Sequence, residues 1–240
     1  MANSYFQFKQ FRVEQAACAM KVCTDACVLG ALAPVAVAHR LLDIGTGTGL
    51  LALMAAQRNP TAQVEAVELD AAAAQQAAAN FAASPWASRL QLHALPLARF
   101  AAGQPAPFDH IVCNPPFFRN SLRSPSPQRT TARHTAEDSL TFAELAGFAA
   151  RFLTATGQLT VLLPPSEMQE FEQEAATAGL FPLTRNVLHH RPGSKALRHI
   201  TTFGRQQGAV TQQELPLHEA DSEAYSSWFR EVMGPFYLAL

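Results

Sequence analysis

Several features of membrane and metal-binding proteins are missing from this chain of 240 residues. No uninterrupted apolar run approaches the ~18 residues of a membrane-spanning helix, so no membrane span is expected. The first residues are polar and aromatic and lack the apolar core of a secretion signal, which favours a cytoplasmic protein. The 4 cysteines form no CxxC pair, so we expect reduced thiols and no metal site.

Charge is also scarce, and its distribution tells more than its sum. Charged residues make up 15% of the chain and the formal net charge is −1, which gives no general attraction to nucleic acid. Two stretches nevertheless carry cations without acids. Segregated cations of this kind are typical of phosphate binding, although solvated loops show them too. The first stretch holds Arg119, Arg123, Arg129 and Arg133, and the second holds Arg185, Arg191, Lys195, Arg198 and Arg205.

A glycine-rich motif follows the first strongly hydrophobic segment. Residues 41–44 are expected to form a strand that contains Asp43, and the motif Gly-x-Gly-x-Gly follows it directly. Gly45 and Gly47 allow a sharp turn and a close approach of a ligand. An apolar helical run comes next, so the amino end of that helix faces the ligand.

Two acids and the glycine spacing favour S-adenosylmethionine (SAM) over a nicotinamide cofactor, which uses a related turn. Asp43 precedes the glycines and can hold the cationic amino-acid end of SAM. The glycines read GxGxG and not GxGxxG. Glu68 ends the next expected strand and can bind both ribose hydroxyls, although it would serve NAD equally well.

The sequence Asn-Pro-Pro-Phe at residues 114–117 follows another hydrophobic run. Proline fixes φ and lacks an N–H, so Pro115 and Pro116 stiffen the turn that leaves the strand. The turn directs the Asn114 side chain and the Pro115 carbonyl, two acceptors that suit an exocyclic amino group on a planar substrate. Phe117 can stack on the ring of that substrate. Alone, the motif is equally an ordinary strand-ending turn, but together with the glycine motif and Glu68 it indicates methyl transfer to an amino group.

Strand-like and helical segments alternate from residue 41 onward. This rhythm predicts an α/β fold with a mostly parallel sheet and helices on both faces. Together with the two motifs, and with a reversed hairpin at the sheet edge, we expect the seven-stranded sheet of a Rossmann-like class I methyltransferase. Both motifs and Glu68 fall at the carboxyl ends of strands, where such sheets bind ligands. Strands are expected at 41–44, 64–68, 90–93, 108–114 and, after a break at Gly157, 159–163, with a reversed edge hairpin of 181–188 and 199–203; helices are expected at 50–57, 71–81, 141–153 and 167–178.

The rest of the chain departs from this rhythm. Residues 14–38 predict one or two helices interrupted at Pro34. Residues 117–135 are arginine-rich and proline-rich, and too long and polar for a simple connection. The amphipathic tail at 225–240 is expected to dock on the core. We expect a single methyltransferase domain over the whole chain, with residues 1–38 as an extension on the cofactor and substrate side.

Short motifs along nearly the whole chain resemble those of one family. The matching segments are residues 8–11, 18–25, 42–45, 50–54, 66–69, 84–87, 114–117, 127–129 and 222–225. In these segments the chain resembles the bacterial tRNA adenine-N6 methyltransferases that modify adenine 37, just 3′ of the anticodon, in a valine tRNA. The resemblance implies SAM as the cofactor and tRNA as the partner, with no obligate protein partner evident.

The resemblance also implies roles for individual residues. Lys21, Thr24 and Asp25 would close over the cofactor, which the residue types alone would not suggest. The expected cofactor-binding set is Lys21, Thr24, Asp25, Asp43, Gly45, Gly47, Glu68 and Asn114. The catalytic set is Asn114, Pro115 and Phe117, and the RNA-binding set is Arg119, Arg123, Arg129, Arg133, Lys195 and Arg198.

Two departures from the family leave alternatives open. Pro96 stands where many relatives carry an Asp that contacts the cofactor adenine, so a backbone group must replace that contact. Phe117 stands where many adenine-directed relatives have Tyr. The Asn-Pro-Pro-Phe motif is also common among rRNA guanine-N2 methyltransferases. The alternatives are therefore an rRNA guanine-N2 or protein glutamine-N5 methyltransferase, or a SAM-binding RNA chaperone without turnover.

Overall fold

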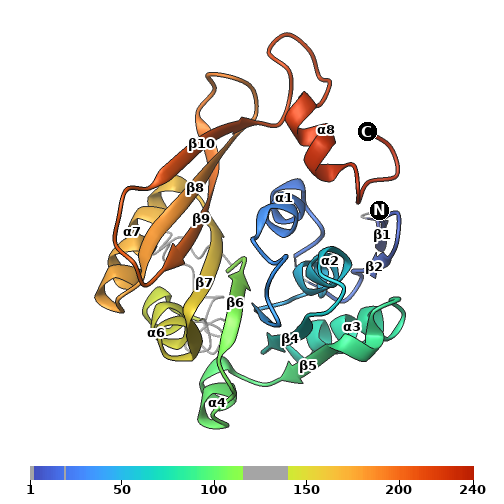
Figure 1. Cartoon of the computed structure of the whole chain (residues 1–240). Helices are drawn as coiled ribbons and strands as arrows, with labels where there is room; N and C mark the ends of the chain where they lie inside the picture. The colour runs from blue at the N-terminus through green and yellow to red at the C-terminus, as the bar shows by residue number, and fades with distance from the viewer. Residues whose placement is uncertain (1–2, 19, 116–139) are drawn as a thin grey trace, which may run out of the picture.

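The protein is described by a computed structural model covering residues 3–18, 20–115 and 140–240 (Figure 1). The strands are β1 (Tyr5–Gln7), β2 (Arg12–Glu14), β3 (Arg40–Ile44), β4 (Gln63–Glu68), β5 (Leu90–Ala94), β6 (Phe108–Cys113), β7 (Leu153–Leu163), β8 (Phe181–His189), β9 (Ala196–Gly204) and β10 (Thr211–Pro216). The α-helices are α1 (Thr24–Leu32), α2 (Leu50–Arg58), α3 (Ala71–Ala82), α4 (Leu97–Ala102), α6 (Phe142–Phe152), α7 (Pro165–Thr177) and α8 (Ser227–Met233).

One large sheet has the strand order β10-β8-β9-β7-β6-β3-β4-β5. All of its neighbouring strands run parallel except where β9 pairs with β7 and β8. The expected mostly parallel sheet is confirmed. Because β6, β3 and β4 are parallel neighbours, their carboxyl ends meet at one edge of the sheet.

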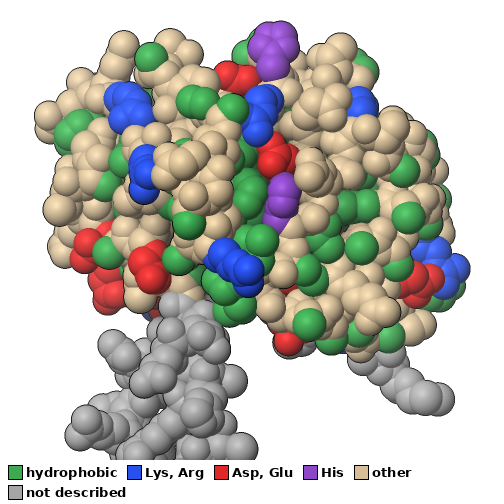
Figure 2. All heavy atoms as spheres, turned by 90° about the horizontal axis from the view of Figure 1, so that it is seen from below, with side chains coloured by type: hydrophobic (Ala, Val, Ile, Leu, Met, Phe, Trp, Pro, Cys, Tyr) green, Lys and Arg blue, Asp and Glu red, His purple; other side chains and the backbone are tan. Residues whose placement is uncertain are grey.

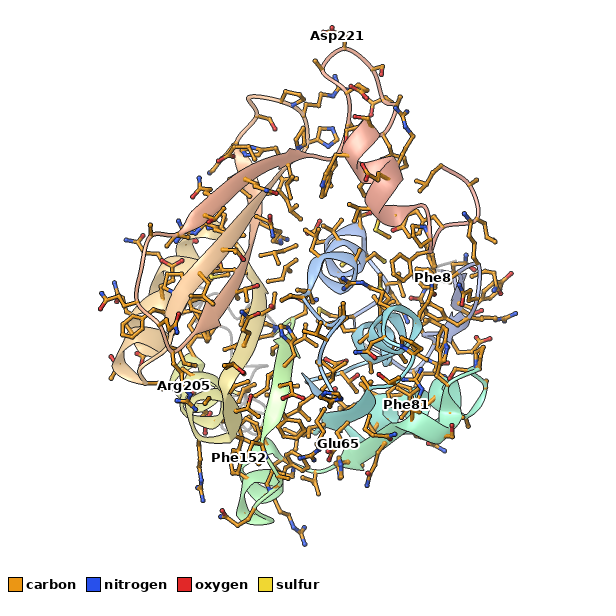
Figure 3. All side chains as sticks on the ribbon, in the orientation of Figure 1. Phe8, Glu65, Phe81, Phe152, Arg205 and Asp221 are labelled. Carbon is orange, nitrogen blue, oxygen red and sulfur yellow. The ribbon has the colours of Figure 1, made fainter. Side chains whose placement is uncertain are left out.

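Hydrophobic side chains pack on both faces of this sheet. Along β3, Leu41 joins one core cluster and Leu42 and Ile44 join the other, as the strand period of two requires. Helices α1, α2, α3 and α8 cover the first face, and α4, α6 and α7 cover the second (Figure 1). Figure 3 shows Phe81 on the first side and Phe152 on the second. The expectation of helices on both faces is confirmed.

The amino-terminal segment differs from the helical prediction. In the ranges that the structure describes, helix begins only at Thr24, after an antiparallel β1–β2 hairpin. Phe8 lies in that hairpin's turn, is fully buried, and stacks on Phe11 at 4.4 Å between ring centroids. The backbone N–H of Lys9 donates to the Phe236 carbonyl at 2.8 Å, which joins the hairpin to the tail.

The carboxyl-terminal tail docks on the core as expected. Phe229 and Met233 of α8 are fully buried in the cluster that α1 and α2 cover. Ser226 caps the helix, because its hydroxyl accepts from the Phe229 N–H at 3.1 Å. No described helix is long and apolar enough to cross a membrane.

Two details of the sheet correct the sequence prediction. Within residues 3–18, 20–115 and 140–240 the sheet has eight strands, since β10 extends it beyond β8. Strand β7 continues through Gly157, where the ladder to β6 shifts between Phe108 and His110. A Cβ at Gly157 would lie 2.8 Å from the Phe108 carbonyl oxygen. Gly157 therefore marks an irregularity in the pairing and not a break between helix and strand.

Candidate cofactor and substrate site

The glycine turn between β3 and α2 is fastened to the end of β4. Gly45 and Gly47 have φ of +69° and +55°, in the left-handed region that favours glycine. The Gly45 N–H donates to the Val67 carbonyl at 2.9 Å, and the Gly47 N–H donates to Glu68 Oε2 at 2.8 Å. A Cβ built on either glycine would meet no atom within 4 Å. The turn thus leaves open space beside two fixed backbone groups, as a closely approaching ligand requires.

Asp43 lies directly before this turn and is 1% exposed. Its Oδ2 accepts from the Thr46 hydroxyl at 2.5 Å and from the Ala52 N–H at 3.2 Å, so it caps α2 from across the turn. Its Oδ1 is buried and has no hydrogen-bond partner among the described residues. Burial raises the pKa of Asp43 to about 7, against the lowering effect of these two hydrogen bonds. The unpartnered oxygen is suited to a cationic group.

Glu68 ends β4 with both carboxylate oxygens on backbone donors. Its Oε2 accepts from Gly47, and its Oε1 accepts from the Asp70 N–H at 2.9 Å. Each carboxylate oxygen has a further lone pair, so the fixed side chain can still accept from two hydroxyls. The acid pair, the open glycine turn and the unpartnered Asp43 Oδ1 fit SAM, which presents an ammonium and a ribose.

Asn114 follows β6 next to the glycine turn, because Cys113 pairs with Ile44 in the sheet. Asn114 Oδ1 is buried and lacks a hydrogen-bond partner in the described part of the chain. Pro115 is buried beside it. Burial, and then the charges of Asp43 and Glu68, raise the pKa of the Cys113 thiol, which shows how close β6 ends to the two acids. Asp43, Gly45, Gly47, Glu68 and Asn114 therefore share one edge of the sheet.

The amino-terminal segment also reaches this edge. Burial and the charges of Glu68 and Asp70 raise the pKa of the Cys18 thiol, whereas Lys21 lowers it. Cys18 therefore lies beside the end of β4, with Lys21 nearby. The exposed Lys21 donates to the Gln15 carbonyl, which sequence reasoning did not anticipate.

Thr24 and Asp25 begin α1 and are half-buried. Burial raises the pKa of the Tyr237 phenol in the tail, and the Thr24 side chain lies close enough to act against that effect. Asp25 Oδ2 lies 3.2 Å from Arg198 Nε on β9. Two residues expected at the cofactor are thus engaged with other parts of the protein.

Most cations of the second basic stretch, residues 185–205, have partners within the protein. The absence of acids from this stretch of sequence therefore does not mean that its cations are unpaired. Arg205 donates to the carbonyls of Ala150 and Leu153 at 2.7 and 3.1 Å. Lys195 is exposed on the turn between β8 and β9. The linear sequence hides these pairings because each partner lies far away along the chain. The ion pairs are Arg185–Glu172, Arg191–Glu223 and Arg198–Asp25.

Some expected site residues lie outside the residues that the structure describes. They are Phe117, Arg119, Arg123, Arg129 and Arg133. Figure 2 shows one side of the molecule, on which Lys, Arg, Asp, Glu and His side chains are interspersed. The described surface on this side carries no continuous basic patch.

Comparisons with known proteins agree with this geometry. A family model described as the methyltransferase small domain matches residues 24–164. The tRNA1(Val) (adenine(37)-N6)-methyltransferase of Dyadobacter fermentans is 43% identical over 240 residues, covering 98% of this chain and 98% of that protein. The protein of the same name from Yersinia pestis strain Pestoides F is 42% identical over 234 residues, covering 97% of this chain and 93% of that protein.

A solved structure supports the fold alone. The crystal structure of a predicted O-methyltransferase from Agrobacterium tumefaciens has a TM-score of 0.67 at 23% sequence identity, covering 88% of this chain and 96% of that one. The two sequence relatives extend the resemblance of the short motifs to nearly the full length of the chain. The chain belongs to the tRNA1(Val) (adenine(37)-N6)-methyltransferase family, within the methyltransferase small-domain proteins.

Proposed function

We propose that this protein transfers a methyl group from SAM to N6 of adenine in tRNA, with adenine 37 of a valine tRNA as the target. The observation that carries the proposal is Asn114 Oδ1, a buried acceptor without a partner among the described residues, at the strand end beside the glycine turn. A buried polar atom of this kind costs free energy unless a ligand satisfies it. Full-length relatives carry the name of this activity.

On the cofactor side, Asp43 holds the ammonium of SAM through Oδ1 and Glu68 accepts from the ribose hydroxyls. Gly45 and Gly47 let the backbone approach closely, since neither carries a side chain into the open space. Pro96 has neither an N–H nor a polar side chain, so backbone groups near it must recognise the cofactor adenine. When bound, SAM supplies a methyl group on a positively charged sulfur.

On the substrate side, Asn114 Oδ1 and the Pro115 carbonyl accept from the N6 amino group of adenine. The lone pair of that nitrogen is delocalised into the ring, and two acceptors draw the nitrogen toward tetrahedral geometry. No general base is needed before transfer, because alignment provides most of the gain. Phe117 stacks on the flipped base, which is cheapest to extrude from an RNA loop.

The amino-terminal residues complete the cofactor side in this proposal. Lys21, Thr24 and Asp25 close over SAM, and residues 1–38 act as an extension of a single domain. The burial of Phe8 and Val13 in the same core as α2 supports this arrangement, because the extension then has no separate core. Since tRNA is the proposed partner, we place the protein in the cytoplasm, with no obligate protein partner.

Phosphate contacts are assigned to the arginine-rich loop and the β8–β9 turn. Strand β9 begins at the carboxyl edge, because His199 pairs with Leu163 at the end of β7. The turn with Lys195 therefore lies on the same edge of the sheet as Asn114. The proposed set is Arg119, Arg123, Arg129, Arg133, Lys195 and Arg198.

The test is methyl transfer to a valine tRNA transcript with labelled SAM, followed by nucleoside analysis. We expect N6-methyladenosine, and no product when adenine 37 of the transcript is replaced by guanine. Label in N2-methylguanosine of rRNA, or on glutamine in protein, would transfer the assignment to those enzymes. Bound SAM without transfer to any of these substrates would favour a non-catalytic RNA chaperone.

A further inference from the structure

We propose that Asn80 is a positioning residue for the cofactor site, and this inference rests on the SAM site proposed above. Asn80 lies on α3 and is 3% exposed. It was not among the residues that the sequence motifs single out. Its amide connects the glycine turn to the amino-terminal segment, and it thereby sets the affinity for SAM without touching it.

The Asn80 amide serves two separate segments. Its Nδ2 donates to the Thr48 carbonyl at 2.8 Å and to the Glu14 carbonyl at 2.8 Å. Its Oδ1 accepts from the Glu14 N–H at 3.0 Å. An amide has two N–H donors, so both are used. Thr48 cannot shift without breaking a buried hydrogen bond, and Glu14 cannot shift without breaking two partly buried ones.

The first segment is the end of the glycine turn. Gly49 has φ of +85° and is the N-cap residue of α2, where it has no side chain of its own to cap the helix. A Cβ at Gly49 would lie 2.5 Å from the Phe81 ring, so α3 packs directly on this position. Asn80 and Phe81 together fix the positions of Thr48 and Gly49. The residue before them is Gly47, whose N–H donates to Glu68.

The second segment contains Glu14 and Gln15, at the end of strand β2. The Val22 N–H donates to Gln15 Oε1 at 2.8 Å, and the proposed cofactor residue Lys21 donates to the Gln15 carbonyl. The Cys18 thiol lies close enough to Glu68 for the carboxylate to raise its pKa, after the larger effect of burial. Because Asn80 holds both backbone groups of Glu14, it fixes the position of Gln15, to which Lys21 and Val22 are bound.

Asn59 provides a matched control for a purely structural role. It is 1% exposed, and its Nδ2 donates to the Val35 and Ala38 carbonyls at 2.7 and 2.8 Å. Its Oδ1 accepts from the Ala62 N–H at 2.9 Å. Asn59 follows α2 and precedes β4, so it lies at the end of these elements away from the glycine turn.

The experiment compares Asn80→Asp and Asn59→Asp by urea unfolding, by SAM calorimetry, and by kcat at saturating SAM. Aspartate keeps the acceptor oxygen but turns the two donors into an oxygen that faces two carbonyls. Both variants should lose stability. Only Asn80→Asp should weaken SAM binding. The expected loss is roughly tenfold in affinity, which corresponds to the net free energy of about one hydrogen bond. Its kcat at saturating SAM should stay within about twofold of wild type, since the reacting groups are untouched.

If Asn80→Asp does not fold, Asn80→Ala is measured in the same way, because it removes the donors without adding a charge. SAM affinity equal to wild type in the folded Asn80 variant would overturn the inference. Equal weakening in Asn59→Asp would overturn it too, because a general loss of stability would then explain both. A wild-type protein that binds no SAM would instead contradict the proposed function.

Discussion

The charge on Asp43 should destabilise the protein before SAM binds, and Asp43→Asn tests this. Only Oδ2 of Asp43 is hydrogen-bonded, so asparagine can place its oxygen there and its NH2 at the unpartnered position. The variant removes the charge and leaves the cap on α2 in place. It therefore isolates the electrostatic cost of the buried carboxylate.

The magnitude follows from the pKa of Asp43, which burial raises from 3.8 to about 7. The folded state binds the proton more tightly than the unfolded state, so stability falls as pH rises between these values and is level above them. The full cost is about 4 kcal/mol, and roughly 2–3 kcal/mol of it develops between pH 5 and pH 8. Asp43→Asn lacks this titration. The free energy of unfolding of the variant, relative to that of wild type, should therefore be roughly 2–3 kcal/mol higher at pH 8 than at pH 5.

The assay is urea unfolding of wild type and variant at both pH values, without SAM. The difference between the two proteins is the quantity to compare, because other groups titrate in both. SAM binding should weaken roughly 10- to 100-fold in the variant, as expected when a charge-assisted hydrogen bond is lost. A stability difference that does not change with pH would refute the buried charge. Unchanged SAM affinity would refute the cofactor role of Asp43.

Three further results are expected. Asn114→Ala should lower methyl transfer by about 10²–10³-fold and leave SAM affinity within about twofold of wild type; an equal loss of SAM affinity in calorimetry would assign Asn114 to the cofactor. Burial, and then the charge of Arg58, lower the pKa of His110 to about 3 from 6.5, so wild type should lose stability as pH falls below 6.5. Relative to His110→Gln, that loss should reach roughly 2 kcal/mol between pH 7.5 and pH 5 by urea unfolding, and a parallel pH dependence would contradict it. Replacing Arg129 and Arg133 together by Ala should weaken tRNA binding and flatten its salt dependence at unchanged SAM affinity, whereas an unchanged salt slope would remove both from the RNA contact.

The central elements were predictable because long apolar runs and strand-ending motifs determine them locally. The strand expected at 64–68 is observed at Gln63–Glu68, and the helix expected at 141–153 spans Phe142–Phe152. Strand β10 was not predicted, because its largely polar sequence shows no alternation and its place depends on pairing with β8. The β1–β2 hairpin was missed for a similar reason, since three residues are too few to show a period.

The candidate site was predictable as a set of motifs but not as a set of contacts. Asp43 and Asn114 could be selected from the sequence, yet that each has one buried oxygen without a described partner depends on tertiary packing. The pairing of Arg198 with Asp25 joins residues far apart in the chain, so linear charge patterns could not reveal it. Asn80 stands in an alanine-rich helix, where nothing in the sequence separates it from an exposed polar residue.

The most direct test of the proposed activity is nucleoside mass spectrometry of tRNA from a strain lacking this protein. The valine tRNA should lose N6-methyladenosine from its anticodon loop and keep its other methylated nucleosides. Restoring the wild-type protein should restore the mark, and restoring Asn114→Ala should not. A strain that keeps this N6-methyladenosine and loses N2-methylguanosine from rRNA would contradict the assignment and point to guanine.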